Sequence, residues 1–324
     1  MRPTHWGGVG LGSDGIFRVD ASALRAWMSC STQAWLRYAR GLTTKGEKAA
    51  LLAGTAGHAA LEAYFRSDGD AKAGRAAFDE VYKAWATQNV AGDDRLAHQN
   101  VSIIMRRWFE AHERKGGGKY ANLPWTVVPE YVEVPFELEL AEGIHLIGKI
   151  DLLPQYNNGF VVVETKTTGS INSWWTAQWK LAAQLTTYLW AARQCIQERV
   201  LGVFVNAIEF GKIPSDPSRR CKTHGKKYAE CGELHAKWEV LGLYERPGRM
   251  IEEWHQEAVQ AATKMRAVFE EADSIEDVQR LSQEGMFNGS CRGCEYAEGV
   301  CDLGRQPHMI EANLVEEWWN PLQA

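Results

Sequence analysis

The 324-residue sequence has no long hydrophobic run and no excess of positive charge. No stretch reaches the roughly 18 uninterrupted apolar residues that a membrane-spanning helix needs, and residues 1–15 are rich in glycine without the apolar core of an export signal. We therefore expect a cytoplasmic protein with no membrane contact. The 36 Lys and Arg against 41 Asp and Glu give a net charge of −5, so any DNA site must be a local patch.

The sequence also lacks an ATPase motif, an internal repeat and a low-complexity linker. Gly116-Gly117-Gly118-Lys119 does not have the spacing of a Walker A loop, which excludes an ATP-driven motor of that kind. With 45% hydrophobic and 24% charged residues, the chain is too apolar for intrinsic disorder and too mixed for a fibre. We expect one folded domain over residues 1–324.

Hydrophobic periodicity predicts that residues 1–124 are mainly helical. Helices are expected over about 19–42, with Ser22 as the cap, and over 49–65, 71–90 and 96–114, the last ending at Gly116 to Gly118. Residues 125–210 alternate apolar and polar side chains. They predict three antiparallel strands ending near residues 140, 153 and 166, with a turn at 157–159, then a helix over 174–197 and a strand over 200–210. This β-β-β-α-β order predicts an α/β fold.

The remaining sequence differs in character. Residues 211–236 are polar and basic and are expected to form an insertion. Residues 237–324 are expected to be helical, with a helix over about 247–271 and a C-terminal cysteine cluster.

Two carboxylates and a lysine close neighbouring predicted strands. Asp151 ends one strand and Glu164 ends the next, and Lys166 follows Glu164 by two residues, so its side chain points to the same face. Two carboxylates brought together on an apolar sheet repel each other unless a bound cation neutralises them. Carboxylate oxygens are hard ligands that suit Mg²⁺ or Mn²⁺. A lysine beside such a metal can hold an attacking water. The alternative is a solvated salt bridge on a strand face.

Other motifs occur in a fixed order around this element. They are a helical Gly54-Thr55-Ala56-Gly57-His58, the pair Gln184 and Tyr188 one helical turn apart, Ser22, Leu24 and Cys30 near the N-terminus, and Cys291-x2-Cys294-x6-Cys301 near the C-terminus. Together with Asp151 and Glu164-Thr165-Lys166 they resemble the PD-(D/E)XK nuclease superfamily. Within it they are similar to the RecB-like branch that carries an iron-sulfur cluster, as in AddB-type nuclease domains and CRISPR-adaptation exonucleases.

The resemblance implies a restriction-endonuclease-like core, in which a mixed central sheet is flanked by helices. It also implies that His58, Asp151, Glu164 and the Thr165 carbonyl hold Mg²⁺ or Mn²⁺. Lys166 would then position water, while Gln184 and Tyr188 would contact DNA and support the site. By the same resemblance, the cysteines of this sequence that would bind a four-iron four-sulfur cluster are Cys30, Cys291, Cys294 and Cys301. The implied activity is a DNA nuclease, and an exonuclease on ends or single strands is favoured because no sequence-reading module is visible.

Several alternatives stay open at this point. Four thiolates suit zinc as well as an iron-sulfur cluster, and buried free thiols are a third option. The Cys221, His224, Cys231 and His235 set in the basic insertion has zinc-type spacing but is more typical of a loop carrying incidental ligands.

Aromatic and acidic residues near the site are also ambiguous. Trp174, Trp175 and Trp179 could stack on unpaired bases or belong to the core. Glu130 and Glu133 are interpreted as structural acids.

The alternative functions are a DNA-end clamp and a subunit of a helicase-nuclease or CRISPR integration complex, with a helicase, recombinase or integration complex as partner. The expected setting is recombination, repair or phage DNA processing.

Overall fold

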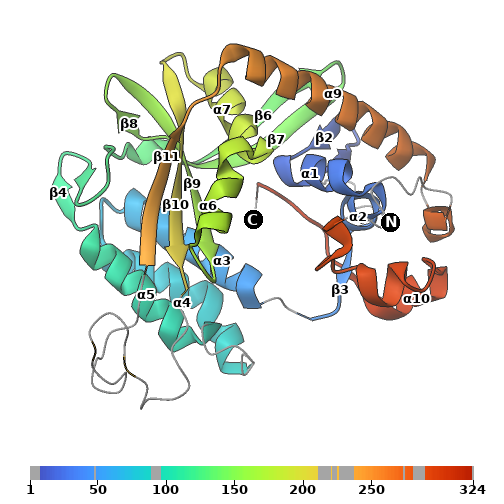
Figure 1. Cartoon of the computed structure of the whole chain (residues 1–324), viewed down its shortest axis with the longest axis horizontal. Helices are drawn as coiled ribbons and strands as arrows, with labels where there is room; N and C mark the ends of the chain where they lie inside the picture. The colour runs from blue at the N-terminus through green and yellow to red at the C-terminus, as the bar shows by residue number, and fades with distance from the viewer. Residues whose placement is uncertain are drawn as a thin grey trace.

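A mixed β-sheet with helices on both faces forms the centre of the molecule (Figure 1). The structure is a computed structural model. It describes residues 8–46, 49–88, 96–210, 220, 225, 237–272, 274–279 and 289–322. The predicted α/β class and its mixed central sheet are confirmed.

The predicted strands of the middle segment form the body of the sheet. Strand β6 (Val132–Ala141) pairs antiparallel with β7 (Ile144–Leu152), and β7 pairs antiparallel with β9 (Gly159–Thr168). Strand β10 (Val200–Glu209) then runs parallel to β9, because helix α7 (Ala183–Cys195) carries the chain back across the sheet. The predicted turn joins β8 (Gln155–Tyr156) to β9, with Asn157 at a φ of +51°.

Four strands of the sheet were not expected from the sequence. One is the short β8. Strand β2 (Phe17–Val19) lies beside the first half of β7 and pairs on its other side with β1 (Gly10–Leu11), and β11 (Lys237–Tyr244) pairs with β10 at the opposite edge. The order is β1-β2-β7-β9-β10-β11, with β6 also on β7. Strands β1 and β2 are too short for an alternating pattern, so pairing within the sheet stabilises them.

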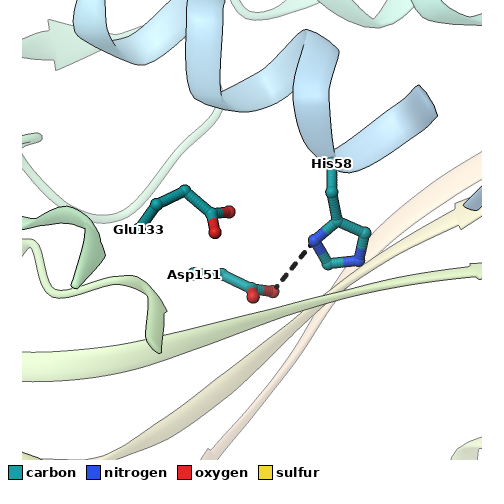
Figure 2. A group of neighbouring side chains, drawn as sticks. All are labelled: His58, Glu133 and Asp151. Carbon is teal, nitrogen blue, oxygen red and sulfur yellow. Dashed lines mark ion pairs between the residues drawn. The ribbon is translucent and has the colours of Figure 1, made fainter. Parts of the chain in front are cut away.

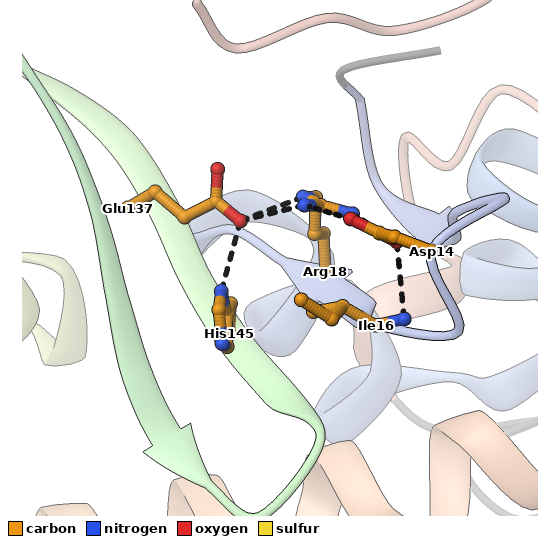
Figure 3. Close-up of polar contacts among 5 residues, drawn as sticks. All are labelled: Asp14, Ile16, Arg18, Glu137 and His145. Carbon is orange, nitrogen blue, oxygen red and sulfur yellow. Dashed lines mark hydrogen bonds and ion pairs between the residues drawn. The ribbon is translucent and has the colours of Figure 1, made fainter. Parts of the chain in front are cut away.

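A charged network connects β2 to β6 across the sheet (Figure 3). Arg18 donates from Nε to Glu137 Oε1 over 2.8 Å and from Nη2 to Asp14 Oδ2 over 2.7 Å. His145 Nδ1 lies 2.8 Å from the same Glu137 oxygen. These contacts keep the short N-terminal strands in register with the long hairpin.

Two hydrophobic cores lie on the two faces of the sheet. One core packs α1 (Ala21–Ser29), the turn Trp35–Ala39, α7 and α9 (Gly248–Glu271) against one face. The other packs α3 (Ala49–Arg66), α4 (Ala71–Gln88) and α5 (His98–Ala111) against the opposite face. Successive side chains of β9 point to opposite faces of the sheet, so this strand contributes to both cores. Val162 belongs to the first core, and Val161 and Val163 belong to the second.

Three local predictions were wrong. Asp20, not Ser22, caps α1, because its carboxylate accepts from the Ala23 amide over 2.6 Å. Helix α5 ends at Ala111, and Gly116 to Gly118 instead form the turn between β4 (Arg114–Gly116) and β5 (Lys119–Tyr120), all three with positive φ.

The third wrong prediction is the continuous helix over 174–197. Extended backbone at Ala182 divides it into α6 (Ser173–Ala177), a 3₁₀ turn (Gln178–Leu181) and α7. Strand β9 is therefore followed by a short helical segment that is separate from α7.

The C-terminal segment returns to the N-terminal helices. Short turns at Ile275–Gln279, Gly289–Cys291 and Ala297–Cys301 precede α10 (Pro307–Asn313), and β12 (Leu314–Glu316) pairs with β3 (Leu42–Thr44). The short helix α2 (Ser31–Ala34) lies nearby in the N-terminal part. None of the helices in the described ranges has the length and apolar character that crossing a bilayer requires.

Candidate functional site

The predicted acidic pair meets where β7 and β9 come together. These strands pair through Leu152 and Val163, and Asp151 and Glu164 are the adjacent residues on each strand. Asp151 Oδ2 accepts a hydrogen bond from the Thr165 amide over 2.7 Å. The expected side-by-side placement of Asp151 and Glu164 is therefore observed.

Lys166 lies on the same side of β9 as Glu164. Its Nζ is 2.5 Å from Glu164 Oε1 and lies 5.9 Å from the centre of the Trp179 ring. Thr165 between them receives a hydrogen bond at Oγ1 from Asn206 over 3.4 Å. The lysine is therefore held between a carboxylate and an aromatic face.

Helix α3 brings His58 to this pair. His58 Nδ1 lies 3.5 Å from Asp151 Oδ2 (Figure 2). The two glycines before the histidine explain the close approach, since a Cβ at Gly54 would lie 3.2 Å from Thr167 Oγ1, and one at Gly57 would lie 3.3 Å from Thr167 Cγ2. A larger residue at either position would push the helix away from β9.

Glu133 is the functional candidate that sequence reasoning missed. The pairs Val132–Leu152 and Val134–Ile150 place it directly opposite Asp151 on β6. Figure 2 shows its carboxylate facing Asp151 and His58, and one ligand atom from each of the three lies within 4.8 Å of the others. Glu130, by contrast, is exposed on the 3₁₀ turn Pro129–Tyr131.

The backbone and a cation hold Glu133 in this position. Its φ is +50°, a left-handed conformation that an L residue with a long side chain adopts at a cost. Its side chain is buried, and Oε2 lies 2.9 Å from Lys149 Nζ. The register of the hairpin was the one sequence signal that could have found this residue, because Glu133 and Asp151 are equally far from its turn.

Burial dominates the electrostatics of the cluster. Removal from water raises the pKa of Glu133, of Asp151 and of Glu164, the last to about 7, and lowers the pKa of His58. Glu164 Oε2 is buried without a hydrogen-bond partner. Buried acids of this kind take up protons unless a cation neutralises them.

The cluster lines a cavity of about 590 Å³. Its walls come from the start of α1, from α3, β6, β7, β9 and α7, and from the C-terminal tail at Trp319 and Pro321. The indole of Trp319 donates to Asp20 Oδ2 over 2.6 Å, so the tail is fastened to the residue that caps α1.

Gln184 and Tyr188 also line the cavity, one turn apart on α7. Burial raises the pKa of Tyr188 well above its ordinary value, so its hydroxyl stays protonated. The structure therefore brings all the predicted catalytic residues to one cavity.

The residues present fit a hard divalent cation. Asp151, Glu164 and Glu133 offer carboxylate oxygens and His58 offers an imidazole nitrogen, a donor set that Mg²⁺ and Mn²⁺ accept. Glu164 Oε2, which is buried without a hydrogen-bond partner, is free to accept such a cation.

The four predicted cluster cysteines line a second cavity of about 200 Å³. It is walled by Cys30, between α1 and α2, and by Cys291, Cys294 and Cys301. Burial raises the pKa of the Cys294 thiol, and that of Cys301 to about 11. The other proposed set, Cys221, His224, Cys231 and His235, lies outside the described residues.

One comparison with known proteins agrees with this geometry. A family model described as the PD-(D/E)XK nuclease superfamily matches residues 18–302. No curated protein matches the chain. The solved structure named "Crystal structure of SSO0001" is 15% identical over 69% of this chain and 78% of that chain, with a TM-score of 0.29, too low to establish a common fold. On the family match, which spans most of its length, the chain belongs to the PD-(D/E)XK nuclease superfamily.

Proposed function

We propose that the protein is a Mg²⁺- or Mn²⁺-dependent DNA exonuclease of the RecB-like branch, acting on ends or single strands as one nuclease domain. The observation that carries the proposal is the convergence of Asp151, Glu164, Glu133, His58 and Lys166 on one cavity. A purely structural salt bridge does not need three carboxylates with raised pKa values, two of them buried and Asp151 half-buried.

The residues divide into metal ligands and a lysine that acts on water. Asp151, Glu164, His58 and the Thr165 carbonyl, with Glu133 added by the structure, would hold the cation. The cation supplies charge neutralisation for the scissile phosphate and acidifies water. Lys166 is held by Glu164 and positions the water whose oxygen forms the new bond to phosphorus.

The reaction breaks the bond from phosphorus to the 3′ oxygen. The departing oxygen takes up a proton, and the other product carries a 5′ phosphate. Gln184 and Tyr188 line the cavity from α7, where the protonated tyrosine hydroxyl and the amide can donate hydrogen bonds to a phosphate.

The four-cysteine cavity is proposed to hold a four-iron four-sulfur cluster, with zinc as the alternative. Four soft sulfur donors from distant segments, 261 residues apart between Cys30 and Cys291, meet there. The bound metal would stabilise the contact between the N-terminal helices and the C-terminal turns. Iron, sulfide and zinc analysis of anaerobically purified protein distinguishes the two.

A nuclease assay tests the function. End-labelled single-stranded and duplex DNA are incubated with wild type, Lys166→Ala and Lys264→Ala in Mg²⁺, in Mn²⁺ and in EDTA. Lys264 is exposed on α9, so its variant controls for the loss of a lysine. We expect cation-dependent cleavage that falls about 100-fold or more only in Lys166→Ala, since positioned acid–base groups contribute on that scale.

The label also reports the direction of cleavage. Wild-type protein that binds DNA but leaves it intact under every condition would show that the proposed activity is wrong. A DNA-end clamp would then be the better account.

A further inference from the structure

Two large apolar side chains are strongly exposed just beyond the catalytic strand. Trp174, on α6, is 79% exposed, and Leu181, at the end of the following 3₁₀ turn, is 77% exposed. Among the described residues, no other large hydrophobic side chain is as exposed as these two. Burial in the core therefore does not account for either side chain.

The segment that carries them is firmly held. Ile171, just before α6, donates its amide to Glu209 Oε2 over 2.6 Å and accepts at its carbonyl from Lys237 Nζ over 2.7 Å. Asn172 caps the helix by accepting from the Trp175 amide over 2.9 Å. Trp174 is thus presented on a fixed support rather than on a free loop.

The support is joined to the catalytic lysine through two buried or half-buried rings. Trp175 contacts Trp179 edge to face, with ring centres 5.3 Å apart, and Trp179 lies under Lys166 Nζ at 5.9 Å. Trp174 is the chain neighbour of Trp175, so these ring contacts connect the segment that carries Trp174 to Lys166.

The segment that carries Trp174 has no acidic residue of its own, although Glu209 from β10 contacts it at Ile171. Residues 165–197 contain no Asp or Glu, although the whole chain has a net charge of −5. Lys180 is exposed within the 3₁₀ turn, next to Leu181. An exposed aromatic ring and an exposed lysine six residues apart in one short helical segment are the two side-chain types that bind unpaired nucleotides, in which the ring stacks on a base and the cation contacts a phosphate.

We propose that Trp174 stacks on an unpaired base of the DNA strand that enters the cavity, with Lys180 on the adjacent phosphate. This proposal rests on the proposed nuclease function and names its substrate as a single-stranded end. In a duplex the bases are already stacked on each other, so Trp174 gains nothing there.

Binding without cleavage tests this. Fluorescence anisotropy with a labelled single-stranded oligonucleotide and a closed hairpin duplex is measured in Ca²⁺, which takes the same oxygen ligands. We expect Trp174→Ala to weaken single-strand binding about 5- to 150-fold, the range of one lost base stack, and to leave duplex binding unchanged. Trp174→Phe keeps a stacking ring and should restore most of the affinity, while Leu303→Ala, on another exposed apolar residue, should have no effect.

Abasic sites identify the contact. Placed one at a time along the oligonucleotide, they should weaken wild-type binding most at one position, and that sensitivity should disappear in Trp174→Ala. Unchanged single-strand affinity in Trp174→Ala, or equal loss on both DNAs, overturns the proposal. Because these measurements need no cleavage, their failure is distinct from the failure of the nuclease assay.

Discussion

The buried carboxyl of Glu164 predicts a pH-dependent stability that a cation should reverse. Glu164 is 2% exposed, with Lys166 on one oxygen and no hydrogen-bond partner on the other. Burial raises its pKa from 4.5 to about 7. The folded state therefore holds this proton more tightly than the unfolded state does.

The direction and the size of the change in the free energy of unfolding with pH follow from this difference in pKa. Because the folded-state pKa is the higher one, the stability from the neutral carboxyl is full below about pH 4.5 and is lost as the pH rises through 7. A difference of about 2.5 in pKa corresponds to about 3 kcal/mol. Asp151 and Glu133, whose pKa values burial also raises, should add to the loss in the wild type.

Urea unfolding at pH 5 and pH 8 in EDTA measures this loss, with Glu164→Gln as the comparison. Gln keeps the shape without the proton, so the wild type should lose about 3 kcal/mol more between the two pH values than the variant does. Glu139→Gln, on an exposed acid of β6, controls for a general charge effect. Mn²⁺ at pH 8 should restore the wild type. Equal losses in wild type and Glu164→Gln would refute the reasoning.

Two further predictions concern the surroundings of the cluster. Glu133→Gln should weaken Mn²⁺ binding about tenfold or more in isothermal titration calorimetry. Glu130→Gln, which changes an exposed acid three residues away, should leave Mn²⁺ binding unchanged. Equal Mn²⁺ affinities of wild type and Glu133→Gln would show that Glu133 is not a metal ligand. Gly57→Val should lower the free energy of unfolding by about 1–3 kcal/mol and reduce cleavage, because the added Cβ would lie 3.3 Å from Thr167 and must displace α3. A variant as stable and active as wild type would show that this contact is unimportant.

Strand β9 shows how much of the candidate site a local sequence pattern predicts. Glu164 and Lys166 are two residues apart on a strand, so their shared face follows from the two-residue period of β structure, and the short turn at 157–159 brings β9 back toward Asp151. His58 was placed by its glycine-framed motif, whose physical reason is the contact of Gly54 and Gly57 with β9.

Other features could not be read in the same way. Glu133 depends on the register of β6 with β7 and on a left-handed backbone at a residue type that seldom adopts it. Trp174 and Trp179 are the same residue type and lie five positions apart in the sequence. Trp174 is exposed, whereas Trp179 is only 8% exposed and lies under Lys166. Both differences arise from packing against distant segments.

By itself the sequence determined the α/β order of the central elements and the strand that carries Glu164 and Lys166, because each of these depends on residues close together in the chain. Only the tertiary structure decided which distant residues meet. It placed Cys30 beside Cys301, Trp319 on Asp20 and Glu133 opposite Asp151. Such contacts are set by strand register and by the burial of whole elements, which no short window of sequence specifies.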